Sequence, residues 1–331
     1  MKRADILFDK ICSIENLRLA EKKARQGKTR SWGVRLFDRD PEGNLLRLRD
    51  LLLSGEYHTS KYTFFQIHDP KERTIARLPY YPDRIVHHAI MNILEPILNK
   101  LYTADTYACI RGRGMHLARK RIMGAMRRDP EGTRYCLKLD IRKYYPSIDH
   151  DIMKRILRRK IKDARLLRLL DEIIDSAPGL PIGNYLSQSF ANVYLAYFDH
   201  FVKEVLRVRY YFRYVDDIVI LSDSKDALRG YLAAMREELA GLRLEVKDNW
   251  QIYPVEARGV DFLGFVFRHG YVRLRKRIKH NIFRALKHAR KVCKTAAEIR
   301  LAVASYIGWL KYTNSINLTN KLNDYCYGKV F

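Results

Sequence analysis

The sequence predicts an α+β fold organised around a ferredoxin-like sheet, with helical regions before and after it. Residues 134–139 and 210–221 are rich in β-branched and aromatic side chains, which is typical of strands. The segments between and after these strands carry helical periodicity, so residues 134–247 follow a β-α-β-β-α-β order. The regions before residue 60 and after residue 275 carry helical patterns and complete the α+β class.

The overall charge indicates a polyanionic partner. The 331 residues include 63 Lys and Arg against 37 Asp and Glu, a formal net charge of +26, and nucleic acid is the simplest partner for such a chain. A membrane surface is the rival partner, but no apolar run approaches the roughly 20 residues of a membrane span. The N-terminus lacks the apolar core of a secretory signal, and we expect a cytoplasmic protein.

The cysteines argue against a zinc site or a disulfide framework. The five are scattered, with no Cys-x-x-Cys pair, which fits a reducing cytosol.

The N-terminal region is expected to be helical and carries no assignable chemistry before residue 60. Residues 4–26 have amphipathic spacing, residues 27–35 form a basic loop, and Asn44 is expected to cap a second helix that ends near Gly55.

Residues 62–78 predict a β-hairpin with a basic turn. Two strand-like segments, 62–67 and 73–78, flank a turn-like segment. Lys71, Arg73 and Arg77 on such a hairpin can hold a triphosphate, although a solvated basic turn is an equally good interpretation. A helix should follow from Pro82 to about residue 101, with its adjacent His87 and His88 in packing or surface roles rather than as metal ligands.

A loop rich in Gly and Arg precedes the next predicted helix, which is basic and runs through Arg128. Arg111 and Arg113 alternate with Gly112 and Gly114, so backbone and guanidinium groups can approach a phosphodiester together. A solvated loop is the alternative interpretation.

Three acids at strand ends are the strongest chemical signal. Asp140 ends the strand 134–139, and Asp216 and Asp217 lie at or beside the turn between two strands. Carboxylates are rarely buried unless they are paired or bound to a cation, although the dipeptide alone is compatible with an ordinary polar turn. Three carboxylates can hold two divalent ions that activate a 3′-hydroxyl and stabilise leaving pyrophosphate.

The later segments supply a loop and more helices around the predicted sheet. Basic helices are expected at 150–160 and 163–176, and the Pro- and Gly-rich loop 177–188 should enter a helix capped by Asn184 or Ser187 and extending to about 206. A base pair or phosphate can rest on such a helix entrance.

A helix at 225–240 and a strand at 242–247 should complete the sheet. A second hairpin is expected from 259–267 and 271–274, before basic helices that look suited to gripping a duplex.

These motifs together resemble those of reverse transcriptases, and the resemblance covers most of the chain. Residues 139–148 resemble the first catalytic motif, residues 214–217 the Tyr-x-Asp-Asp motif, and residues 262–264 the primer-grip hairpin, in the same order and spacing. The resemblance implies a right-hand polymerase with fingers over 1–135, a ferredoxin-like palm over 136–267 and a helical thumb over 268–331. Since little chain follows the thumb, we expect ribonuclease H, endonuclease and maturase activities to come from other proteins.

The loop at 181–188 resembles one subfamily in particular. Retrons, group II introns and retroviruses typically have Pro-Gln-Gly there, whereas this chain has Pro181-Ile182-Gly183-Asn184 followed by Ser187-Gln188. With residues 106–109, this resembles the reverse transcriptases of phage and bacterial diversity-generating retroelements. The resemblance implies a template-repeat RNA copied with errors opposite adenine in the cytoplasm of a bacterial host, and a small basic accessory variability protein as a partner. The alternatives are a bacterial reverse transcriptase of another role, antiphage or retron-like, and a catalytically silent RNA-binding relative.

The resemblance also implies roles for single residues. Asp140, Asp216 and Asp217 would hold two Mg²⁺ ions, with the Ile141 carbonyl as a further ligand. The remaining implied contacts are with the triphosphate (Lys71 and Arg73), the sugar 2′ position (Tyr145, otherwise a core aromatic), the nascent base pair (Ile182, Gly183 and Gln188), the pyrophosphate (Lys247, as an acid) and nucleic acid (Arg111, Arg113, Phe262, Leu263 and Gly264).

Ile182 suggests a physical reason for low fidelity. Its apolar side chain cannot donate the hydrogen bond that Gln could give to a nucleotide or template sugar. Loss of such a contact costs roughly 1–2 kcal/mol, which is about tenfold in discrimination. This hypothesis explains greater error in general but not the choice of adenine.

Overall fold

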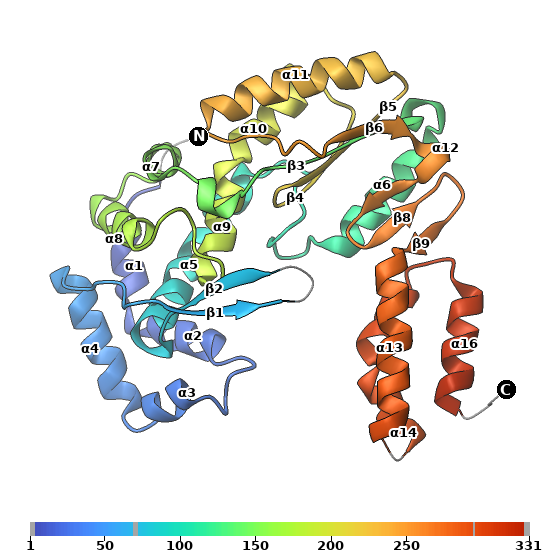
Figure 1. The fold of residues 1–331 in the computed structure, drawn as a ribbon. Coiled ribbons are helices and arrows are strands. Elements are labelled where there is room, and N and C mark those ends of the chain that lie inside the picture. Colours follow the sequence, from blue (N-terminus) through green and yellow to red (C-terminus); the bar gives the residue numbers. More distant parts are fainter. Residues whose placement is uncertain (1–3, 69–71, 294, 328–331) are drawn as a thin grey trace. The chain divides into compact units, whose positions relative to one another are not determined.

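The computed structural model describes residues 4–68, 72–293 and 295–327 (Figure 1). The chain divides into two compact units. Unit 1 comprises residues 1–109, 141–205 and 235–246, and unit 2 comprises residues 110–140, 206–234 and 247–331. Over the ranges described, no helix is both long enough and apolar enough to cross a membrane.

Unit 1 begins with short helices whose boundaries differ in part from the predicted ones. The expected helix 4–26 is two helices, α1 (Phe8–Cys12) and α2 (Ile14–Ala24), because Ser13 is extended and its hydroxyl caps α2 by accepting from the Asn16 N–H. Helices α3 (Trp32–Phe37) and α4 (Pro41–Ser54) follow. Asp40 caps α4, not Asn44 as predicted, since Asp40 precedes Pro41 and accepts from the Gly43 N–H. The predicted end at Gly55, with φ +78°, is confirmed.

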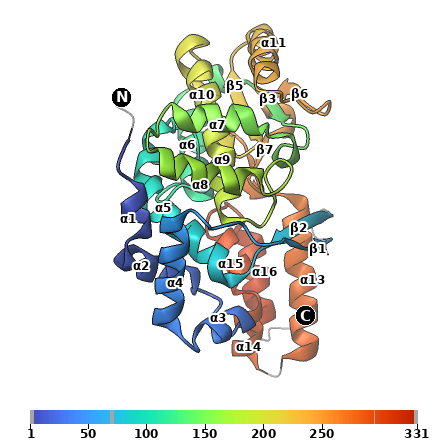
Figure 2. The same ribbon diagram turned by 90° about the vertical axis from the view of Figure 1, so that its left-hand side faces the viewer.

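The predicted hairpin and the helix after it are confirmed in unit 1. Strands β1 (Thr63–Ile67) and β2 (Arg73–Arg77) pair antiparallel. Helix α5 (Ile85–Leu98) follows the helical turn Tyr80–Arg84 and packs against α1, α2 and α9 at the centre of unit 1 (Figure 2). His87 and His88 are buried in α5, as expected of packing residues.

The remaining helices of unit 1 lie close to their predicted ranges. They are α7 (His150–Arg158), α8 (Ala164–Asp175), α9 (Tyr185–Tyr194) and α10 (Ala196–His200), followed by a turn at Phe201–Val205. Asn184 caps α9 by accepting from the Leu186 N–H. Short helical turns occur at Asn99–Leu101 and Tyr145–Ser147.

Three of the four strands in the main sheet of unit 2 lie where the sequence predicts them, and the fourth, β6 (Gln251–Pro254), was not predicted. The predicted strands are β3 (Tyr135–Asp140), β4 (Tyr210–Tyr214) and β5 (Asp217–Ser222). The four strands lie in the order β4-β5-β3-β6 with every neighbouring pair antiparallel, which is the order of a ferredoxin-like sheet (Figure 1). A short helical turn, Glu131–Thr133, precedes β3.

The prediction of a strand at 242–247 is wrong, because these residues form no strand in the structure. Helix α11 (Lys225–Gly241) ends in a Schellman-type turn: Arg243 adopts φ +56°, its N–H bonds to the Ala240 carbonyl, and the Leu244 N–H bonds to the Leu239 carbonyl. The alternation of apolar and charged residues therefore belongs to a helix end, and only Val246 forms an isolated bridge, with Ile141.

Unit 2 also contains a second sheet and the C-terminal helices. The predicted strand 259–267 is two strands, β7 (Val260–Phe262) and β8 (Phe265–Phe267), because Leu263 and Gly264 form a two-residue turn with φ +52° and +82°. Strand β9 (Val272–Leu274) pairs with β8. The helices are α6 (Met115–Arg128), α12 (Val255–Arg258), α13 (Lys276–Val292), α14 (Ala296–Ala302), α15 (Ala304–Leu310) and α16 (Ile316–Tyr327).

Candidate active site

The main sheet of unit 2 brings the three predicted acids together. Asp140 is the last residue of β3, and Asp217 is the first residue of β5 and its direct antiparallel partner. Directly paired residues project to the same face, with Cβ atoms about 5 Å apart. Asp216 lies in the two-residue turn between β4 and β5, so the predicted hairpin with its acids at the turn is confirmed.

The turn that carries Asp216 is conformationally strained. Val215 adopts φ +59°, which β-branched residues rarely do and which occurs most often where function requires it. The side chain of Arg213, which is fully buried, donates from Nη1 to the Val215 carbonyl at 2.9 Å. This hydrogen bond supports the strained turn from inside the unit.

The electrostatic state of the acids reflects their mutual repulsion. Burial, the negative charge of Asp140 and a hydrogen bond shared with Asp140 raise the pKa of Asp216 to about 7. Burial is also the main reason that the pKa of Asp217 rises to about 6, with a further rise from Asp140 that Lys138 and Arg275 oppose. The Oδ1 atom of Asp217 is buried and lacks a hydrogen-bond partner among the described residues.

These carboxylates suit a divalent cation. Within the described ranges, no three His, Cys, Asp or Glu side chains converge closely enough to form a complete metal site. Burial and the charge of Asp140 nevertheless raise the pKa of Asp216, and Asp217 Oδ1 has no partner among the described residues, so a cation can offset the repulsion and satisfy that oxygen. Carboxylate oxygens are the donors that Mg²⁺ prefers.

Three further charged residues near the acids, Lys138, Asp261 and Arg275, were not predicted from the sequence. Lys138 Nζ donates to the Asp261 carbonyl at 2.5 Å, and Arg275 Nε donates to Asp261 Oδ1 at 2.7 Å. Lys138 is two residues before Asp140 on the same strand, so the period-two rule could have placed it on the acid face. The pair of Asp261 and Arg275 joins β7 to the start of α13 and has no comparable sequence signal.

The other residues predicted for the site in unit 2 lie in three places. The backbone N–H of Lys247 donates to the Asp140 carbonyl at 2.8 Å, which brings this residue beside the acid strand. Phe262 is buried, and Leu263 and Gly264 form the β7–β8 turn. Arg111 is exposed and Arg113 is half-buried in the loop before α6.

Unit 1 brings a different set of predicted residues together. The Ala76 N–H of β2 donates to the Ile182 carbonyl at 2.7 Å, so Ile182 and Gly183 lie against the strand that carries exposed Arg73. Lys71 lies outside the described residues.

The remaining predicted residues of unit 1 lie elsewhere in it. Tyr145 is half-buried with its ring edge-on to Tyr144 at 5.8 Å. Gln188 is exposed and accepts a hydrogen bond from the Cys109 thiol at 3.4 Å. Ile141 is buried and bridges to Val246.

Sequence comparison decides the family. The family model described as "Reverse transcriptase (RNA-dependent DNA polymerase)" matches residues 68–267, which is more than half of the chain and contains all three acids. The chain belongs to the reverse transcriptase family. Members of this family generally use divalent metal ions.

Several curated proteins are similar to this reverse transcriptase, and two of the three described here are named for introns. Protein YkfC of Escherichia coli is 27% identical over 47% of this chain and 45% of its own length. The group II intron-encoded protein LtrA of Lactococcus lactis is 27% identical over 39% of this chain and 22% of its own. Nuclear intron maturase 4 of Arabidopsis thaliana is 24% identical over 60% of this chain and 25% of its own. The alignments therefore span less than half of each relative.

Solved structures show the same fold. Apo telomerase from Candida tropicalis superposes with a TM-score of 0.55 at 12% identity, over 82% of this chain and 57% of that chain. The reverse transcriptase therefore has the right-hand polymerase fold that the motifs implied.

Proposed function

We propose that this chain is an RNA-directed DNA polymerase with fingers, palm and thumb at 1–135, 136–267 and 268–331. The observation that carries the proposal is the placement of Asp140 and Asp217 as direct partners on adjacent strands, with Asp216 at the turn beside them. Buried carboxyls that repel one another are a costly arrangement unless a cation is bound there.

The three acids would hold two Mg²⁺ ions, with the Ile141 carbonyl as a further ligand. When bound, the ions activate a 3′-hydroxyl and neutralise charge on the departing pyrophosphate. The positive charges of Lys138 and Arg275 favour the ionised form of Asp217, which is the form that binds a cation.

Other residues would bind and orient the substrates. The ammonium group of Lys71 and the planar guanidinium group of Arg73 would contact the triphosphate. Tyr145 would exclude a ribose 2′-hydroxyl, and Lys247, held beside Asp140 by its backbone, would protonate the pyrophosphate. Arg111, Arg113 and the turn at Leu263 and Gly264 would contact the nucleic acid.

The biological role that we propose is diversification of a target gene by a diversity-generating retroelement. The support is the loop at Ile182, whose carbonyl is bonded to β2. A Cβ on Gly183, which has φ +113°, would lie 2.5 Å from the Ala76 carbonyl, so the loop can sit this close only with glycine there. The backbone of Ile182 is thereby held beside the hairpin, and its apolar side chain cannot donate a hydrogen bond. A template-repeat RNA and a small basic accessory protein would be its partners.

A second role is favoured by the intron-encoded relatives. LtrA and the plant maturases are named for group II introns and for intron maturation, so a function in copying or maturing an intron RNA is the competing proposal. Accurate copying of every template base would favour this role, whereas errors concentrated at adenine would favour diversification.

Primer extension tests both levels of the proposal. The full chain would be given Mg²⁺, four dNTPs and an adenine-containing RNA template with a DNA primer, and the products would be sequenced. We expect extension with errors concentrated opposite adenine. Accurate products would reject the mutagenic role, and extension that survives Asp217→Asn would reject the assignment of the acids.

A further inference from the structure

A histidine that the proposed chemistry does not use joins three segments of unit 1. His150 is the first residue of α7, and its half-buried ring lies between the last residue of α8, Asp175, and the loop that follows α8. Its Nδ1 lies 3.1 Å from Asp175 Oδ1, and its Nε2 lies 3.0 Å from the Gly179 carbonyl oxygen. Helix α7 also packs against α8 and α9, so the ring lies in a well-packed part of unit 1 (Figure 2).

Both partners of the His150 ring are hydrogen-bond acceptors. A backbone carbonyl only accepts, and so does an ionised carboxylate, so the two hydrogen bonds form together when each ring nitrogen carries a proton. The other carboxylate oxygen of Asp175 accepts from Lys154 Nζ at 2.5 Å, which holds the carboxylate in place. The ring therefore donates twice and ties Gly179 to the ends of two helices.

The residue that His150 holds is packed against the backbone of Tyr145. Gly179 adopts φ +59°, and a Cβ there would lie 2.6 Å from the Tyr145 carbonyl oxygen and 2.7 Å from that of Pro146. The loop can approach this closely only with glycine at position 179. The next residue adds a hydrogen bond, because the Leu180 N–H donates to the Tyr145 carbonyl at 2.8 Å. The contact that fixes Gly179 therefore also fixes the backbone of Tyr145.

The second half of the same loop has anchors of its own. The Ile182 carbonyl accepts from the Ala76 N–H at 2.7 Å, and Asn184 Nδ2 donates to the Tyr62 hydroxyl at 3.0 Å. Neither hydrogen bond involves His150. Loss of the His150 ring should therefore release Gly179 and Tyr145 while Ile182 stays in place.

We propose that His150 is a positioning residue for selection of the nucleotide sugar, because it holds Gly179 against the backbone of Tyr145. The inference rests on the proposed function, in which Tyr145 excludes a ribose 2′-hydroxyl. His150 touches no substrate and acts only through the position of Tyr145. A displacement of about 1 Å at a positioning contact can change a rate about 10²-fold, so a small movement of Tyr145 is enough to admit a ribonucleotide.

Two substitutions separate the two hydrogen bonds of the ring. In His150→Gln, the longer amide side chain places a donor near the position of Nε2 and can still reach the Gly179 carbonyl. In His150→Asn, the shorter amide places a donor only near the position of Nδ1. His200→Asn is the matched control, because the His200 ring also lies between a carboxylate and a backbone carbonyl, those of Glu204 and Leu101.

Single-nucleotide incorporation by the full chain with Mg²⁺ measures sugar and base selection separately. Opposite template guanine, kcat/KM would be measured for dCTP, CTP and dTTP. We expect His150→Asn to lower the preference for dCTP over CTP about tenfold, with His150→Gln and His200→Asn within about twofold of the parent. The preference for dCTP over dTTP should stay within about twofold in all variants, because Ile182 keeps its anchor. Equal losses of sugar and base selection in His150→Asn, or an equal loss of sugar selection in His200→Asn, would overturn the proposal.

Hydrogen exchange tests the same contact without catalysis. We expect the Leu180 amide to exchange about tenfold faster in His150→Asn than in the parent, and at the parent rate in His150→Gln and His200→Asn. Unchanged exchange in His150→Asn, or faster exchange with unchanged sugar selection, would overturn the proposal. A parent chain that fails to extend a primer would reject the proposed function, whereas the exchange rates would still decide whether His150 holds Gly179 against Tyr145.

Discussion

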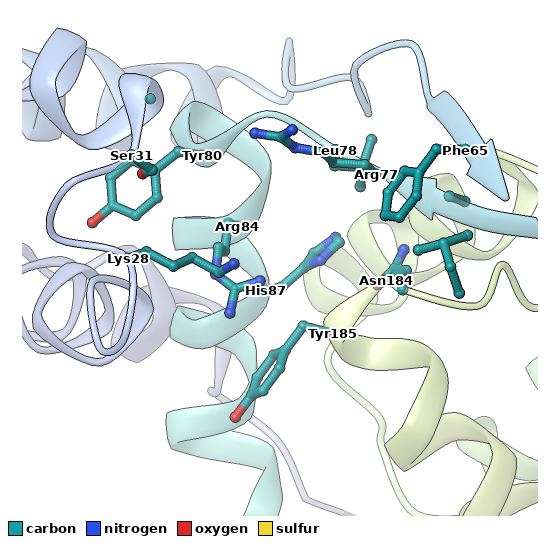
Figure 3. A pocket seen from close by; sticks show the side chains of 14 residues that line it. Lys28, Ser31, Phe65, Arg77, Leu78, Tyr80, Arg84, His87, Asn184 and Tyr185 are labelled. Atoms are coloured by element: carbon teal, nitrogen blue, oxygen red, sulfur yellow. The ribbon is translucent and has the colours of Figure 1, made fainter. Parts of the chain in front are cut away.

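The acid cluster of unit 2 and the cationic cavity of unit 1 are two solutions to the same physical problem. Asp140, Asp216 and Asp217 form the acid cluster, and Lys28, Arg77 and Arg84 line the cationic cavity (Figure 3). Each group lies with a buried polar atom that has no hydrogen-bond partner among the described residues, Asp217 Oδ1 in the first and His87 Nε2 in the second. In each, a pKa is shifted toward the neutral form: burial and then the charge of Asp140 raise the pKa of Asp216, and the charge of Arg84 and then burial lower the pKa of Lys28. The comparison teaches that a cluster of one charge indicates the sign of its ligand: a cation for unit 2 and an anion for unit 1.

The largest expected effect separates the two clusters by function. Asp217→Asn removes a charge that a catalytic cation requires, and loss of several kcal/mol of transition-state stabilisation corresponds to a decrease of about 10³-fold or more in extension rate. Affinity for single-stranded RNA in EDTA should stay within about twofold, because the substitution removes no positive charge. Single-turnover extension and RNA titration measure the two quantities.

The exposed Asp248→Asn is the charge-matched control for this experiment. It should leave both quantities near the parent values. A comparable loss of extension in Asp248→Asn, or retention of extension in Asp217→Asn, would break the distinction between the clusters.

The second prediction concerns pH. The folded-state pKa values of Asp216 and Asp217, about 7 and about 6, lie above the ordinary value of 3.8, so the native state binds protons more tightly than the unfolded state. Without divalent ions, the stability that these protons supply should be fully present below about pH 4 and be lost as pH rises to about 7. Mg²⁺ competes with the same protons, so stabilisation by Mg²⁺ should be larger at pH 8 than at pH 5.5.

Thermal unfolding with 10 mM Mg²⁺ or with EDTA at the two pH values checks this sign. The Asp216→Asn variant should lose most of the difference between pH 8 and pH 5.5. A Mg²⁺ effect that is equal at both pH values would show that the acids are not the groups that bind the ion.

The third prediction concerns Ile182, which lies in the same unit as the cavity. Ile182→Gln restores a donor beside β2, and a hydrogen bond worth roughly 1–2 kcal/mol should raise fidelity at template adenines about tenfold. Ile316→Gln makes the same substitution at a site that is 72% exposed and should leave the error spectrum unchanged. Sequencing of extension products measures both. An unchanged spectrum in Ile182→Gln would remove the physical basis proposed for the errors.

The two clusters also differ in how well the sequence predicts them. The acids could be found because Asp216 and Asp217 are adjacent and because strand composition places Asp140 at the end of a neighbouring strand. The cations could not, because Lys28, Arg77 and Arg84 come from separate segments, and only tertiary packing brings them to one cavity. His87 was expected in a packing or surface role and is buried, but only the structure shows that its Nε2 atom has no hydrogen-bond partner among the described residues.

The sequence predicts the fold better where structure is locally encoded. The β1–β2 hairpin, strands β3, β4 and β5 of the main sheet and most helices were predicted, because strand composition and helical periodicity are local properties. The strand at 242–247 and the undivided strand at 259–267 were wrong. Both failures involve residues other than glycine with positive φ, Arg243 and Leu263, and no side-chain pattern marks that conformation.

The smallest expected effect tests whether the cavity is preformed by its packing. Gly33 in α3 and Gly308 in α15 are both helical, and replacing glycine with alanine in a helix gains up to about 1 kcal/mol from helix propensity alone. A Cβ at position 308 meets nothing within 4 Å, whereas a Cβ at position 33 would lie 2.7 Å from the Cβ of buried Tyr80. Gly308→Ala should therefore stabilise the protein by about 0.5–1 kcal/mol. Gly33→Ala should destabilise it by about 1 kcal/mol, because overpacking costs more than the propensity gain. Urea unfolding measures both signs, and a Gly33→Ala variant that is as stable as Gly308→Ala would mean that the wall yields, so that packing does not hold the three cations at fixed positions.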